Sequence, residues 1–185
     1  MKKQEIVVPN LVPPVGGYII YPLTVQVRYD QDWQKALTHA GPLTSPCRSS
    51  SAKKWEGYVR DIGNLWPPTP TSVKKVELIL ISNYTGNGDW STACLWAHQF
   101  GLKKTVPREV FAIGENHPDL DEIILVDKLE IYAATDFSFQ GYKRNICRIC
   151  WARPDYLSPS YRWVDCSTHM HLTLREKTEW IAFRK

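Results

Sequence analysis

Four residues near the C-terminus have types and spacing suited to holding a metal ion. Cys147 and Cys150 are three positions apart, fifteen residues follow, and Cys166 and His169 repeat the same separation. Two such pairs form a ligand set for tetrahedral structural zinc. The flanking residues are large and apolar, however, and indicate a strand, in which side chains three apart point to opposite faces. The main prediction is therefore that these residues belong to the core and surface and bind no metal, with a zinc site as the alternative.

A basic, aromatic run from Tyr142 to Trp163 is the main candidate binding surface. It carries five Lys or Arg residues against one carboxylate, Asp155, with aromatic residues between them. Aromatic rings stack on sugars, bases or partner side chains, and guanidinium groups make paired contacts with carboxylates or phosphates. The predicted ligand-binding residues are Tyr142, Arg144, Arg148, Trp151, Tyr156, Tyr161, Arg162 and Trp163. The alternative is a twisted meander whose aromatic side chains face inward and whose arginines are solvated.

The ligand of this run is predicted to be a protein, a peptide or a glycan rather than nucleic acid. The net charge is mild, at 23 − 19 = +4, and does not by itself indicate nucleic acid. The rest of the chain shows no second basic stripe and no signature of an RNA-binding module. A zinc-stabilised nucleic-acid-binding protein that uses the same run is the second hypothesis.

Residues that could carry catalysis are few. Cys94 and His98 lie one turn apart on a predicted helix, and Asp119, Asp121 and Glu122 form an acidic run. A nucleophile pair also needs an oxyanion site and an orienting group, and the sequence identifies neither. Cys94 is expected in the core and the acidic run in a solvated turn. We therefore predict no catalytic residue and no cofactor, and a small enzyme is the weaker alternative.

The elements that must position these residues are strands and short helices. Alternating apolar residues and turn signals predict the strands, and three-to-four spacing predicts the helices. Strands are predicted at Tyr18–Tyr29, Val73–Tyr84, Ile123–Ala134, Asn145–Trp151, Tyr161–Cys166, His169–Leu174 and Glu179–Phe183. Helices are predicted at Gln31–Ala40, at Trp90–Phe100 and within Gly101–Leu120.

Several single residues predict where these elements begin and end. Pro22 removes a ladder donor, which favours an edge position or a bulge for the first strand. Asp89 is expected to cap the second helix, and Gly101 to end it in a left-handed conformation. Thr105 is expected to cap the third helix, which would end at Gly114.

Length and composition indicate one globular domain over residues 1–185, with a lead-in at 1–17 and a long irregular loop at 42–72. Hydrophobic residues make up 43% and charged residues 23%, which is typical of a globular chain. Neither a signal peptide nor a membrane-spanning segment is recognisable, so the expected location is the cytoplasm and no membrane partner is expected. The five cysteines are then expected to be mostly reduced.

Five short motifs occur in a fixed order along the chain. They are Tyr21–Val25 (YPLTV), Gly101-Leu102, Glu109–Gly114 (EVFAIG), His117–Leu120 (HPDL) and Trp180–Lys185 (WIAFRK). This order and spacing resemble a family of uncharacterised proteins that recur in Patescibacteria genomes. The chain departs from that family at Val106, where a Thr is expected, and in the run EIYAATD, which replaces an ALGS-W run. The resemblance implies no activity.

A more distant similarity concerns the fold. A short helix near the middle and a C-terminal meander ending in a strand resemble the C-type-lectin-like fold. That resemblance implies an α+β domain with short helices packed on a mostly antiparallel sheet. It also implies that the first strand pairs with the last and that the meander faces the ligand. Together with the basic, aromatic run, it leads us to predict a non-enzymatic ligand-binding module.

Overall fold

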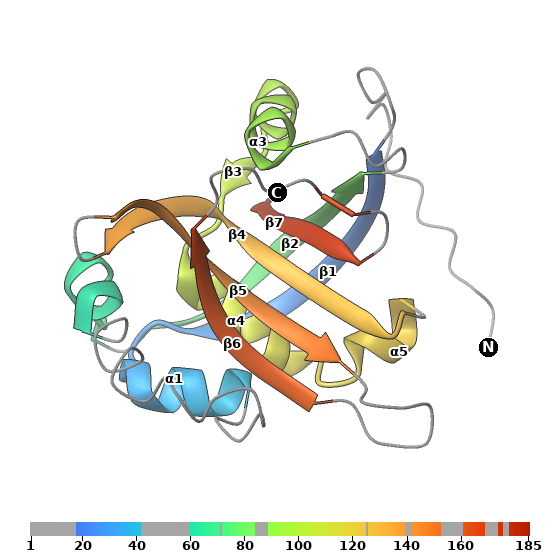
Figure 1. The fold of residues 1–185 in the computed structure, drawn as a ribbon. Coiled ribbons are helices and arrows are strands. Elements are labelled where there is room, and N and C mark those ends of the chain that lie inside the picture. Colours follow the sequence, from blue (N-terminus) through green and yellow to red (C-terminus); the bar gives the residue numbers. More distant parts are fainter. Residues whose placement is uncertain are drawn as a thin grey trace.

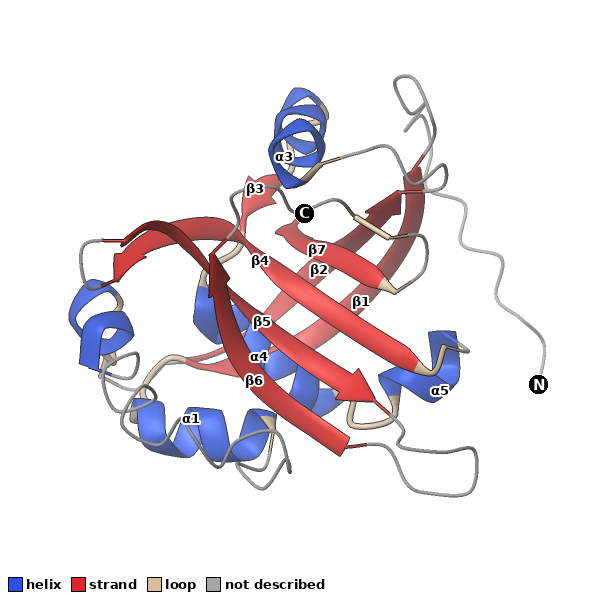
Figure 2. Cartoon of the chain, viewed as in Figure 1, coloured by secondary structure: helices blue, strands red, loops and turns tan. Residues whose placement is uncertain are grey.

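The computed structural model of the chain shows a mixed α and β fold built on one sheet. It describes residues 18–41, 60–70, 72–83, 89–124, 126–139, 142–152, 161–168, 174–175 and 178–185. The strands are β1 (Tyr18–Arg28), β2 (Val73–Asn83), β3 (Lys103–Lys104), β4 (Lys128–Phe139), β5 (Tyr142–Ala152), β6 (Tyr161–Thr168) and β7 (Glu179–Arg184). The helices are α1 (Trp33–Ala40), α3 (Trp90–Gln99), α4 (Pro107–Asn116) and α5 (Leu120–Ile124). Figures 1 and 2 show this arrangement.

The strand order is β1-β2-β7-β4-β5-β6, and β3 also pairs with β7. All pairings are antiparallel except that of β4 with β7. The prediction that the first and last strands pair with each other is wrong, because β2 lies between them. β2 ends in a run of consecutive buried residues from Leu78 to Asn83, as expected of a strand covered on both faces. β1, which contains Pro22, lies at the edge of the sheet as predicted.

Helix α4 is buried along most of its length and lies against the sheet and α1. Every residue from Pro107 to Gly114 is buried, and the helix contacts β1, β4, β5 and α1. The strongly twisted sheet curves around it (Figure 1). The predicted end at Gly114 is wrong, since the helix continues to Asn116. A Cβ at Gly114 would lie 2.0 Å from Ile149 Cδ1 and 2.2 Å from the Ala40 carbonyl oxygen, so glycine here permits close packing rather than helix termination.

Helix α3 lies at the opposite end of the molecule from α1 (Figure 2). Its predicted caps are confirmed, because the Asp89 carboxylate accepts a hydrogen bond from the Thr92 amide at 2.6 Å and Gly101 has φ +77°. The amides of Gly101 and Leu102 donate to His98 and Ala97, which closes the helix with a Schellman motif. This turn leads the chain directly into the short strand β3.

The predicted helix cap at Thr105 is wrong, because Thr105 joins strands instead. Its buried hydroxyl donates to the Ala182 carbonyl oxygen at 2.6 Å and accepts from the Ala134 amide at 3.0 Å. Val106 takes the N-cap position of α4, and its amide donates to the Glu109 carboxylate. A hydroxyl that bridges β7 and β4 is therefore unavailable to the helix.

Three other boundaries differ from the predicted ones. The predicted strand at Ile123–Ala134 is replaced by α5 followed by β4, which begins only at Lys128. Within the predicted irregular loop at 42–72, residues 60–65 form a short helix that buries Ile62. Residues 1–17 and most of His169–Leu174 lie outside the described residues. None of the described helices has both the length and the apolar character that crossing a bilayer would need.

Candidate functional site

The predicted binding residues are divided between the two faces of the β5–β6 pair. Residues directly opposite each other in an antiparallel pair point to the same face, and neighbours along a strand point to opposite faces. The register therefore groups Trp151 with Arg162 on one face, and Arg148 with Asp165 on the other, where Trp163 also lies. Tyr156 lies outside the described residues, and the side chains of Tyr142 and Arg144 are not described.

Trp151 belongs to the core and not to a ligand surface. Its exposed fraction is 0%, and its indole nitrogen donates to the Pro118 carbonyl oxygen at 2.8 Å. Arg162 lies on the same face and donates to the His39 carbonyl oxygen in α1 at 3.3 Å. The prediction that Trp151 anchors a ligand is therefore corrected, because strand alternation turns it toward the helices. Tyr161, which is 42% exposed, and the half-buried Trp163 stay accessible.

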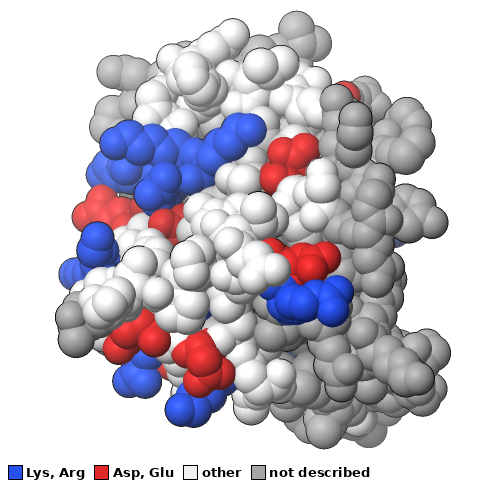
Figure 3. Space-filling model, turned by 90° about the vertical axis from the view of Figure 1, so that its left-hand side faces the viewer, with Lys and Arg blue, Asp and Glu red and all other residues white. Residues whose placement is uncertain are grey.

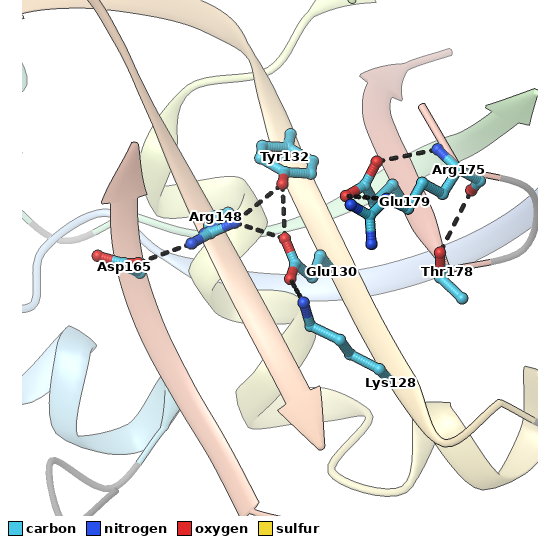
Figure 4. Close-up of polar contacts among 8 residues, drawn as sticks. All are labelled: Lys128, Glu130, Tyr132, Arg148, Asp165, Arg175, Thr178 and Glu179. Carbon is cyan, nitrogen blue, oxygen red and sulfur yellow. Dashed lines mark hydrogen bonds and ion pairs between the residues drawn. The ribbon is translucent and has the colours of Figure 1, made fainter. Parts of the chain in front are cut away.

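The other face of β4, β5 and β6 carries a group of charged residues that we call the ionic cluster: Lys128, Glu130, Tyr132, Arg148 and Asp165 (Figure 4). Arg148 forms ion pairs with Glu130 and, at 2.9 Å, with Asp165, and it also donates to the Tyr132 hydroxyl oxygen at 2.9 Å. The Tyr132 hydroxyl donates to Glu130 at 2.6 Å. Lys128 pairs with the other carboxylate oxygen of Glu130. Arg148 thus joins three neighbouring strands.

Burial makes the charges of the ionic cluster strongly interdependent. Burial opposes ionisation of Glu130, but the Arg148 guanidinium and the contacts from Lys128 and Tyr132 outweigh it and lower its pKa. Burial raises the pKa of Tyr132, and the Glu130 carboxylate adds to that rise. Burial also raises the pKa of Glu179, whose strand neighbour is Glu130. Each described charge of the cluster has a partner within it, so the ion pairs of the cluster link β4, β5 and β6.

The residues predicted for the zinc alternative do not meet at one point. Cys147 faces Cys166, with 3.2 Å between their sulfur atoms. Cys150 lies on the opposite face of β5, beside Trp163, as three-residue spacing in a strand requires. His169 lies outside the described residues, and among the described ones no group of three or more metal-ligating side chains is present. The proposed set of four ligands is therefore not assembled.

A groove beside α3 is the best candidate for a binding site. We call it the α3 groove; its volume is about 580 Å³. It lies between one side of α3, the turn after it, and strands β3 and β7. Its lining residues are Trp90, Ser91, Cys94, Leu95, His98, Gly101, Leu102, Lys103, Lys104 and Phe183. Most of this lining is apolar, and Leu95 is 68% exposed. A concave site with a mostly apolar lining and a few polar groups is typical of ligand-binding sites.

The charges at the α3 groove are positive. Lys103 and Lys104 are exposed on β3, where Lys103 lies opposite Arg184 of β7. Neither lysine forms an ion pair with a carboxylate of the described part of the chain, whereas Arg184 contacts Glu109 at 3.6 Å. On the face of the molecule drawn in Figure 3, Lys and Arg side chains gather in one area, with acidic side chains below them. The lysines that line the groove are Lys103 and Lys104. The groove therefore offers an apolar wall with a cationic rim.

Cys94 and His98 both line this groove, but Cys94 is poorly suited to act as a nucleophile. Burial raises the pKa of the Cys94 thiol to about 12, and Lys104 only partly opposes this rise. A thiol in that state is almost fully protonated near neutral pH, and the thiolate is the reactive form. The groove thus presents Cys94 as a small apolar group. Two features of the sequence could have indicated the groove. One is the apolar Leu95 next to Trp96, which is buried in the structure, and the other is the lysine pair that follows the turn at Gly101.

Comparison with known proteins returned no matching family model, no matching curated protein and no matching solved structure. The chemistry of the described side chains therefore carries the functional assignment.

Proposed function

We propose that this protein is a non-enzymatic binding module that holds an acidic, apolar peptide segment of a partner protein in the α3 groove. The observation that carries the proposal is an open groove of about 580 Å³ in which exposed Leu95 stands beside two lysines without a described ion-pair partner. That volume lies within the range of known ligand sites. Apolar contact supplies affinity there, and complementary charge supplies orientation and association rate.

The lining favours a peptide over the other expected ligands. Glycans are recognised by stacking on open aromatic faces, but the aromatic residues that line the groove, Trp90 and Phe183, are only 5% and 1% exposed. Nucleic acid requires a series of cations that follows the phosphate backbone. The rim of this groove instead supplies two adjacent lysines. Apolar side chains followed by a carboxylate match both the Leu95 wall and the Lys103–Lys104 rim.

The non-enzymatic assignment is supported by the state of the Cys94 thiol and of the ionic cluster. The Cys94 thiol is held neutral by burial, and the ionic cluster neutralises its own charges. A general acid or base must be free to exchange a proton with a bound ligand. Neither group provides that freedom.

Several finer predictions from the sequence stay proposals. The C-type-lectin-like fold is supported by the single sheet and the β4–β5–β6 meander, while the separation of β1 from β7 counts against it. The Patescibacteria resemblance and the cytoplasmic location stay predictions. Tyr161 and Trp163, on edge strand β6, stay proposed as a second and smaller contact surface.

A peptide-display selection against the folded protein tests the proposal. The random library is first depleted on a Leu95→Asp variant, so that the retained peptides depend on the apolar wall of the groove. Peptides combining apolar residues with Asp or Glu are expected. Their affinity, measured by fluorescence anisotropy, should fall at least about tenfold on Leu95→Asp, since an apolar anchor is replaced by a charge that repels the acidic ligand.

Ile123→Asp is the matched control, because Ile123 is also an exposed aliphatic residue, at 56%, but lies on α5 away from the groove. This variant is expected to leave affinity unchanged. Retained peptides that are basic, or an equal loss of affinity in both variants, would contradict the proposal. Selection of no peptide at all would contradict it as well.

A further inference from the structure

Two buried thiols lie directly opposite each other on neighbouring strands. Cys147 of β5 and Cys166 of β6 are register partners, and their sulfur atoms are 3.2 Å apart. Opposite residues of an antiparallel pair have Cα atoms about 4.5 to 5.5 Å apart. This separation falls inside the range that disulfide geometry requires. A bond between the two sulfurs therefore needs no large movement of the backbone.

We propose that Cys147 and Cys166 form an oxidation site that closes to an intrachain disulfide between β5 and β6. The oxidant is a small-molecule disulfide such as glutathione disulfide. One protein thiolate attacks a sulfur of the oxidant, its S–S bond breaks, and one glutathione thiolate leaves. The second protein thiolate then attacks the mixed disulfide and displaces the other glutathione. The two protein thiols lose two protons and two electrons, and the oxidant becomes two thiols.

Burial controls when this reaction takes place. Cys147 is 0% exposed and Cys166 is 4% exposed, and burial raises the pKa of Cys166 well above its ordinary value. Both effects protect the two thiols from oxidants while β5 and β6 stay paired, because attack needs an accessible thiolate. Among the described strands, β6 is the last in the sheet order and pairs only with β5. Local opening of this edge strand exposes both thiols without global unfolding, so we expect oxidation at the rate of that opening.

The other described cysteines are not placed to take part. Cys150 lies beside Trp163 on the opposite face of β5, and Cys94 is on α3. The position of Cys166 opposite Cys147 therefore makes one specific pairing the expected product.

The test is a thiol count on the full chain before and after incubation with glutathione disulfide. The protein is denatured, alkylated and weighed by intact mass spectrometry. Of five cysteines, all five should be alkylated in the reduced protein and three in the oxidised protein. Peptide mapping without reductant should then locate the bond between Cys147 and Cys166.

Two variants with four cysteines each separate this pair from the rest. Cys166→Ala should keep all four thiols reactive after oxidation, whereas the matched Cys150→Ala should fall from four to two. The oxidised wild-type protein is also expected to melt higher, by on the order of 10 °C, because the bond closes a loop of about twenty residues. Five reactive thiols after incubation, a bond to any other cysteine, a persistent glutathione adduct or a lowered Tm would overturn the proposal. The peptide map of the wild-type protein decides the matter even if a variant does not fold.

Discussion

Replacing Arg148 by methionine tests whether the ionic cluster fastens the sheet. Methionine keeps much of the side-chain volume and removes the guanidinium that pairs with Glu130 and Asp165. The Glu130 side chain is 4% exposed and the Asp165 side chain 35% exposed. Asp165 can therefore be solvated in the variant, while Glu130 is left as a buried carboxylate with Lys128 as its cation.

The expected cost follows from that burial. Removing one partner of a buried ion pair costs about 3 to 5 kcal/mol, because the other charge loses its compensation. Lys128 still pairs with Glu130, so we expect the lower end of this range for Arg148→Met, about 3 kcal/mol at pH 7. Arg60→Met is the matched control, because Arg60 is 68% exposed and its ion pair among the described residues is with its neighbour Asp61. Its effect should stay below about 0.5 kcal/mol.

The dependence on pH distinguishes a lost ion pair from lost packing. In the wild-type protein the pKa of Glu130 is lowered from its ordinary value of 4.5 in the folded state. Its ionisation therefore contributes stability above that value, and this contribution is lost as the pH falls through the folded-state pKa. Removing Arg148 removes the largest of the contributions that lower the pKa of Glu130, so we expect burial to raise this pKa in the variant and protonation to relieve the variant as the pH falls. The difference in the free energy of unfolding should consequently shrink on acidification from about pH 7 to about pH 5.

Urea unfolding of Arg148→Met, Glu130→Gln and the double variant measures these quantities. The double variant should be more stable than the two single effects predict when added, because residues in one network couple. A cost below about 1 kcal/mol at pH 7 would refute the fastening role. A deficit that grows as the pH falls would refute the assignment of the effect to the Glu130 carboxylate.

Two further substitutions test how the sheet and helix α4 are joined. Gly114→Ala should destabilise the fold by about 1 to 3 kcal/mol in urea unfolding, since its Cβ would meet a backbone carbonyl at 2.2 Å. Gly63→Ala is its control and should cost little, because the nearest atom, in the Trp33 ring, is 3.3 Å away. Thr105→Val should cost about 1 to 3 kcal/mol, because it leaves a buried amide and a buried carbonyl without their shared hydroxyl. An effect of Thr105→Val no larger than that of Gly63→Ala would refute this role.

Local patterns in the sequence predicted local structure well. Alternation predicted β1, and Pro22 predicted its edge position. Asp89 and Gly101 predicted both ends of α3, because caps depend on a few neighbouring backbone groups. The insertion of β2 between β1 and β7 could not be predicted in this way, since it depends on which apolar faces meet across the sheet.

The candidate site was harder to predict because composition does not show which way a side chain points. The run from Tyr142 to Trp163 is basic and aromatic, yet alternation buries Trp151, which donates to the Pro118 carbonyl oxygen, while Arg148 belongs to the ionic cluster. Successive side chains of such a strand point to opposite faces of the sheet, so only every second residue can contribute to one surface. The prediction for Thr105 failed for the same reason. A threonine is a suitable helix cap, but the position of Thr105 directs its hydroxyl to backbone groups of β7 and β4.

Whether a Lys or Arg side chain already has a carboxylate partner decides whether its charge is available to a ligand. Arg148 is held by Glu130 and Asp165, Arg184 by Glu109, and Lys185 by Glu77. A ligand that approached any of these would have to compete with a carboxylate already in place. Lys103 and Lys104 form no ion pair with the described carboxylates, and both line the α3 groove beside exposed Leu95. An acidic ligand at this groove therefore displaces no described carboxylate, and it also meets the apolar lining, which is why we assign recognition there rather than to Arg148.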